Sequence, residues 1–112
     1  MSVQLFSALG GPLRVLRLLA VDHPHLPAPC VSVSTVTPDL LELSFHDDLA
    51  GFEAWREALG IDPGSVSHRV HAHGGTRVLK AETQFAGAWL HLIGFAKTPA
   101  SEEERSRAGA AS

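Results

Sequence analysis

Two segments of the chain carry apolar residues at helical spacing. Leucine and valine recur every three or four residues between Pro12 and Asp22, which predicts a buried helix. A proline-rich connector follows over residues 23–29. A second helix is predicted over residues 48–59, with an aspartate cap at its start and Gly60 as a left-handed stop.

Alternation of apolar and polar residues predicts five strands. Residues 31–36 and 40–46 form a hairpin around residues 37–39 (Thr-Pro-Asp), because proline presets the backbone for a tight turn. Three more strands occupy residues 65–96, and Gly74-Gly75 forms the two-residue turn between the first two of them.

The turn at Gly74-Gly75 sets an expected register for its hairpin. Val70 then pairs with Leu79, and these two residues lie on the core side. Arg69 lies on the opposite, polar side, so the hairpin is predicted to be apolar inside and polar outside.

The predicted element order is helix–strand–strand–helix–strand–strand–strand. This order indicates an α+β fold with a largely antiparallel sheet packed with two helices. Residues 1–97 are predicted to form the single domain. Residues 98–112 are small and charged, and we expect them to be a disordered tail.

The last strand, residues 88–96, is apolar on both sides, and the turn before it decides which side enters the core. A two-residue turn at Ala86-Gly87 exposes the Trp89 side, whereas a three-residue turn, favoured by turn chemistry, exposes the leucine side. The interface candidates are therefore Trp89, His91, Ile93 and Phe95 on one side and Leu90 and Leu92 on the other.

Two arrangements account for this extra apolar side. In one, the helices lie on opposite faces of the sheet, or the N-terminal segment covers the exposed strip. In the other, both helices share one face, and the open face is an interface with a second copy or another protein. A small-ligand pocket between helix and sheet is a further possibility.

Histidines are the first candidates for metal chemistry, and the chain has seven. His71 and His73 form an H-x-H pair on one side of a predicted strand, which is a partial zinc or nickel site. His91 lies two strands away, at about 10 Å, which is too far for a shared ion. We therefore expect ordinary strand histidines and no cofactor, with Zn or Ni at the H-x-H pair as the alternative.

No other motif predicts catalysis. Gly74-Gly75 leads into a strand rather than a helix, so a turn is favoured over a phosphate-binding loop. Cys30 is the only cysteine, and a lone cysteine at the start of a strand is most often packed. The His46-Asp47-Asp48 run is assigned to capping. These features favour a protein that is not an enzyme.

Composition narrows the class of protein. The chain has 112 residues and a net charge of −3, which argues against a nucleic-acid partner. The longest apolar runs are too short to cross a membrane, and the N-terminus lacks the pattern of a signal peptide. A cytoplasmic protein that forms homodimers or other homo-oligomers, or binds another protein, is the expectation.

Three segments of the chain carry a family resemblance: FEAWREALG, HAHGGTRVLKAE and FAGAWLHLIGFA. Together they resemble a group of small uncharacterised proteins common in actinobacteria and their phages and plasmids. Members share a helix with a central tryptophan, an HGGT turn and a closing apolar strand. The resemblance implies this fold and a bacterial or mobile-element source. The function predicted is a small interaction or accessory module, and the alternative is a His-dependent metal- or ligand-binding protein.

Overall fold

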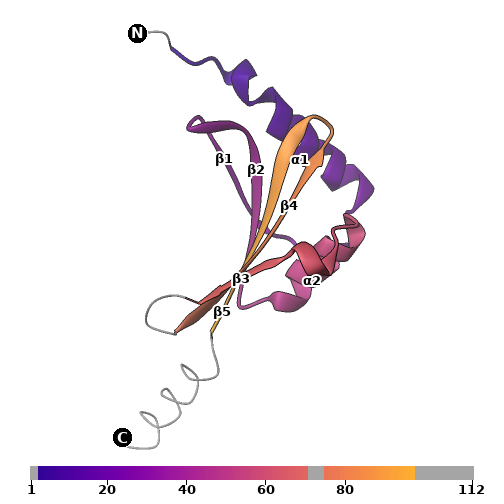
Figure 1. The fold of residues 1–112 in the computed structure, drawn as a ribbon. Coiled ribbons are helices and arrows are strands. Elements are labelled where there is room, and N and C mark those ends of the chain that lie inside the picture. The colour runs from indigo at the N-terminus through magenta and orange to yellow at the C-terminus, as the bar shows by residue number, and fades with distance from the viewer. Residues whose placement is uncertain (1–2, 71–74, 98–112) are drawn as a thin grey trace, which may run out of the picture.

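The computed structural model describes residues 3–70 and 75–97. Within these residues, two α-helices and five strands follow the order α-β-β-α-β-β-β, which confirms the predicted α+β class. The elements (Figure 1) are η1 (Phe6–Leu9), α1 (Gly10–Asp22), β1 (Cys30–Ser34), β2 (Thr37–His46), α2 (Leu49–Ala58), η2 (Pro63–Ser65), β3 (Ser67–Val70), β4 (Thr76–Phe85) and β5 (Ala88–Lys97).

The five strands form one sheet in the order β1-β2-β5-β4-β3. All neighbouring strands are antiparallel except β2 and β5, which run parallel. The last strand of the chain is therefore the middle strand of the sheet. Both edges of β5 are therefore paired within the chain, whereas its two faces are covered differently.

Both α-helices lie on the same side of the sheet (Figure 1). Val15 and Leu19 of α1 and Phe52 and Trp55 of α2 are buried there. The arrangement with one helix on each face is thereby excluded. The strand residues of this core are Leu41, Leu43, Phe45, Ala81, Ala88, Leu90 and Leu92.

Local contacts place α2 where the sequence predicts it. The Asp48 carboxylate accepts a hydrogen bond from the Gly51 N–H at 2.9 Å, so Asp48 is the N-cap. Gly60 has φ of 69° and ends the helical segment as expected. The Trp55 indole N–H donates to the Pro27 carbonyl at 2.7 Å, which ties the proline-rich connector to the helix.

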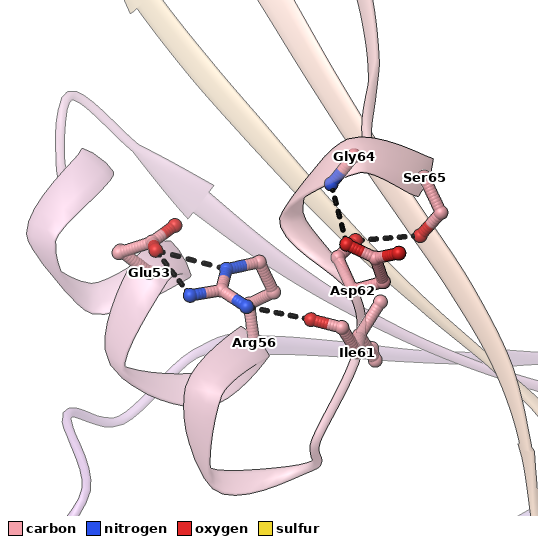
Figure 2. A network of polar contacts seen from close by, with 6 residues as sticks. All are labelled: Glu53, Arg56, Ile61, Asp62, Gly64 and Ser65. Carbon is pink, nitrogen blue, oxygen red and sulfur yellow. Dashed lines mark hydrogen bonds and ion pairs between the residues drawn. The ribbon is translucent and has the colours of Figure 1, made fainter.

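Arg56 joins the end of α2 to the segment that leads into β3 (Figure 2). Its guanidinium donates to the Glu53 carboxylate from Nε at 2.9 Å and to the Ile61 carbonyl from Nη1 at 2.6 Å. The hydrogen bond from Arg56 lowers the pKa of the Glu53 carboxyl below its ordinary value. Beyond Ile61, the Asp62 carboxylate accepts from the Gly64 N–H and starts η2.

The first hairpin differs from the sequence prediction. Its turn lies at residues 35–36 rather than 37–39. The register with β2 shifts after Val33, which leaves residues 38–40 as a bulge. Pro38 explains the shift, because proline cannot donate the N–H that regular pairing would use.

The second hairpin is displaced by two residues from its predicted register. Val70 pairs with Arg77 rather than with Leu79. A displacement of two keeps each residue on its predicted side of the sheet, so Arg69 remains opposite the helices. The core position predicted for Val70 was wrong, since its side chain is 54% exposed. The helices pack on β2 and β5, whereas β3 is the edge strand on the far side of β4.

Several sequence predictions fall on undescribed parts of the chain. The Gly74 position of the predicted turn, both histidines of the H-x-H pair and the predicted tail over residues 98–112 lie outside the described residues. Among the residues that the structure describes, no helix is long and apolar enough to span a membrane.

Candidate interaction face

The turn between β4 and β5 decides which side of β5 is buried. Phe85 pairs with Ala88, so Ala86 and Gly87 form a two-residue turn. Both turn residues have positive φ, 48° for Ala86 and 86° for Gly87. The preference for a three-residue turn was wrong because Ala86 adopts a left-handed conformation that non-glycine residues rarely take.

This turn divides the interface candidates into two groups. Leu90 and Leu92 are fully buried beneath the helices and are unavailable to a partner. The other four candidates lie on the side without helices, in register with residues of β2 and β4. We call the resulting surface the open face: Leu40, Glu42, Ser44 and His46 of β2; Trp89, His91, Ile93 and Phe95 of β5; Val78, Lys80, Glu82 and Gln84 of β4.

The open face has an apolar middle strand between more polar neighbours. Trp89 is 45% exposed, whereas Trp55 in the core is 5% exposed. Ile93 and Phe95 are half-buried by the side chains around them. The side chains of residues 89, 91, 93 and 95 thus lie on this side of β5, and three of these four are apolar.

Charged groups cross the open face at two neighbouring levels. Glu42 and Glu82 flank His91, and the His91 Nε2 lies 3.9 Å from the Glu82 carboxylate. One level along, Lys80 lies beside Ile93, and its ammonium is 3.3 Å from Glu82. Acidic groups therefore gather at the His91 level and a basic group at the next.

His91 is less easily protonated than an ordinary histidine. Burial lowers its pKa, and the positive charge of Lys80 lowers it further. The carboxylates of Glu82 and Glu42 act in the opposite direction without reversing the shift. Burial therefore favours the neutral imidazole over its charged form.

A shallow hollow of about 330 Å³ lies at the Trp89 end of the open face. The bulge at residues 38–40 forms one wall, and Trp89 forms another. Glu82 and His91 complete the lining from β4 and β5. One sequence signal accompanies this hollow, Pro38 inside β2, which the sequence pattern assigns to the turn instead.

The other end of the open face is held by His46. Its ring stacks on Phe95 with centroids 4.8 Å apart and planes 8° apart. The backbone N–H of Asp47 donates to the Phe95 carbonyl at 2.7 Å. Sequence reasoning missed this contact, because the parallel pairing of β2 with β5 joins segments that are about 50 residues apart in the chain.

The residues that the structure describes do not assemble a metal centre. Residues 3–70 and 75–97 contain no group of three or more side chains of the metal-binding types placed to hold an ion. His71 and His73 are outside these ranges. Cys30 is exposed on the edge strand β1, and His46 and Asp48 serve the stacking and capping contacts described above.

No protein-family model matches the chain, and comparison with curated proteins and with solved structures found no match either.

Proposed function

We propose that this chain is a non-enzymatic interaction module that self-associates through the open face. The observation that carries the proposal is the central row of β5, in which Trp89, Ile93 and Phe95 lie on the side opposite both helices. The second side of this sheet is apolar along its middle strand, so covering that side with another surface lowers the free energy.

The composition of the open face supports a protein partner. Its centre is apolar and aromatic, and its charged residues Glu42, Lys80 and Glu82 lie on the flanking strands. Protein interfaces commonly combine an apolar centre rich in tryptophan and phenylalanine with a polar margin. The lowered pKa of His91 favours its neutral form, which is less costly to bury in an interface than the charged form.

The size of the open face is comparable to what one partner contributes to a standard interface. β2, β4 and β5 have ten residues each, and β1 and β3 extend the sheet at its two edges. At usual strand dimensions the sheet covers roughly 600 Å² in projection. One partner in a standard protein interface contributes about 800 Å² of accessible surface.

The resemblance to small proteins of actinobacteria and their phages suggests the biological system in which this interaction takes place. An accessory or regulatory module of a bacterial or mobile-element system, acting in the cytoplasm, would be small and would work through contacts with other proteins. Self-association is the part of the proposal that the open face supports directly.

Sedimentation equilibrium of wild-type protein and Trp89→Ser tests the proposal. The wild-type protein is expected to dimerise at micromolar concentrations. Trp89→Ser should weaken the dimer at least tenfold, because a large aromatic side chain is lost from the interface. The indole is 45% exposed, so the variant should remain folded.

Phe6→Ser is the matched control, since Phe6 is a large apolar residue that is 75% exposed and lies in η1, which leads directly into α1 rather than forming part of the open face. It should leave the dimer unchanged. A wild-type protein that stays monomeric, or a dimer that responds to Phe6 and not to Trp89, would overturn the proposal.

A further inference from the structure

The open face constrains how a second copy can pack against it. Packing of the β5 row on the β5 row of a second copy buries the largest number of apolar side chains against one another. A lateral shift by one strand would place Ile93 against Lys80 and Trp89 against Gln84. Two face-to-face arrangements with a two-fold axis keep β5 on β5, and they differ in the direction of the second copy's strands.

In the first arrangement, the axis runs along the strands, and the two β5 strands are parallel. β4 of one copy then lies over β2 of the other. Glu82 would face Glu42 of the second copy at the same level, and His91 would face its own counterpart. Two pairs of carboxylates would approach within one sheet spacing, which disfavours this dimer.

In the second arrangement, the axis runs across the strands, and the two β5 strands are antiparallel. β4 of one copy then lies over β4 of the other. With the axis midway between the levels of His91 and Ile93, Glu82 faces Lys80 of the second copy, and Lys80 faces its Glu82. Trp89 falls at the level of Phe95 of the second copy, so the aromatic residues also meet.

We propose that two copies of the chain pack open face to open face with antiparallel β5 strands, and that reciprocal Glu82–Lys80 pairs set this direction and register. The inference rests on the proposed self-association through the open face and adds its geometry. Glu82 and Lys80 carry opposite charges at adjacent positions on one side of β4. Each can face its opposite charge in the second copy only when the strands of that copy are antiparallel to those of the first.

Charge reversal separates the two arrangements. Glu82→Lys should weaken the antiparallel dimer about tenfold, because two lysines of one copy then face two of the other. The same change would strengthen a parallel dimer, in which residue 82 faces Glu42 of the second copy. Lys80 and Glu82 have side chains that are 40% and 50% exposed, so neither substitution threatens the fold.

Complementation provides the decisive comparison. Lys80→Glu alone should also weaken the dimer about tenfold, whereas a mixture of Lys80→Glu with Glu82→Lys should form a heterodimer of near wild-type affinity. The double variant Lys80→Glu, Glu82→Lys should dimerise like wild type. Sedimentation equilibrium of each variant and of the equimolar mixture gives these affinities.

The native Cys30 gives a test without substitution. Its register with Ser44 places it on the same side of the sheet as the open face. In the antiparallel dimer the two Cys30 Cα atoms would lie about 12 Å apart, and in the parallel dimer about 22 Å apart. A short homobifunctional maleimide should therefore link the wild-type dimer efficiently and leave Trp89→Ser unlinked.

The outcomes distinguish the geometry from the proposed function. A dimer that Trp89→Ser weakens, but that Glu82→Lys strengthens and the maleimide does not link, would overturn the antiparallel geometry and leave self-association standing. A wild-type protein that is monomeric, with no crosslinking at Cys30, would overturn both.

Discussion

Trp55 and Trp89 show how position rather than residue type assigns a role in this chain. Trp55 is almost fully buried, and its indole N–H is satisfied by the Pro27 carbonyl. Trp89 is half exposed and lines a hollow on the open face. Their difference follows from the helical spacing that directs Trp55 inward and from the two-residue turn that directs Trp89 outward.

At the same scale, His91 should make stability depend on pH. Its pKa is lowered in the folded state by burial and by Lys80, against Glu82 and Glu42, and is about 6.5 in the unfolded chain. Between these two values the unfolded state binds more protons, so stability is complete above about pH 6.5 and falls as pH falls through this window. Melting temperatures of dilute wild-type protein should therefore decrease as the pH is lowered from 7 to 5.

His91→Gln is the matched variant for this effect, because glutamine is polar and does not titrate. Its melting temperature should decrease less than that of the wild type over the same pH range, since the other histidines are unchanged. Identical slopes for the two proteins would contradict the role given to His91.

At the scale of elements, the central strand β5 ties the helical layer to the open face. Its even-numbered residues pack under α1 and α2, and a Cβ at Gly94 would lie only 3.3 Å from the Phe52 ring, so glycine allows α2 to approach closely. Its odd-numbered residues form the central row of the open face. One side of β5 therefore packs in the core, and the other side is available for binding.

Truncation of neighbouring residues tests this division. Leu92→Ala should lower the free energy of unfolding by about 3 kcal/mol, because it leaves a cavity in the core. Ile93→Ala should cost about 1 kcal/mol in the monomer, because its side chain is only half-buried, and should weaken dimerisation. Urea unfolding at low protein concentration measures both. The reverse order of stability losses would indicate the register of a three-residue turn.

The elements themselves were largely predictable from the sequence, whereas their pairing was not. Helical periodicity and the aspartate and glycine signals located α2 to within a residue at each end, because capping is a local property. The parallel pairing of β2 with β5 leaves no local signal. Ala86 in a left-handed conformation goes against its intrinsic preference, so turn chemistry pointed to the wrong register and left the open face undecided.

At the scale of the whole molecule, the sheet has one side covered by helices and one side available to a partner. The covered side contains the buried core, and the open face carries an aromatic row with charges that are self-complementary in one direction. Exposed apolar residues also occur in the N-terminal segment, at Val3, Leu5 and Phe6. A measurement of self-association must therefore also locate the surface that becomes buried.

Quenching of tryptophan fluorescence by acrylamide, measured across a dilution series of the wild-type protein, reports self-association and also locates the surface that it buries. The chain has two tryptophans, and Trp55 is protected in the core at every concentration. If the open face closes on a second copy, Trp89 should be protected at high concentration and become quenchable as the dimer dissociates. A quenchable fraction that stays constant on dilution, whatever the state of association, would contradict an interface at the open face.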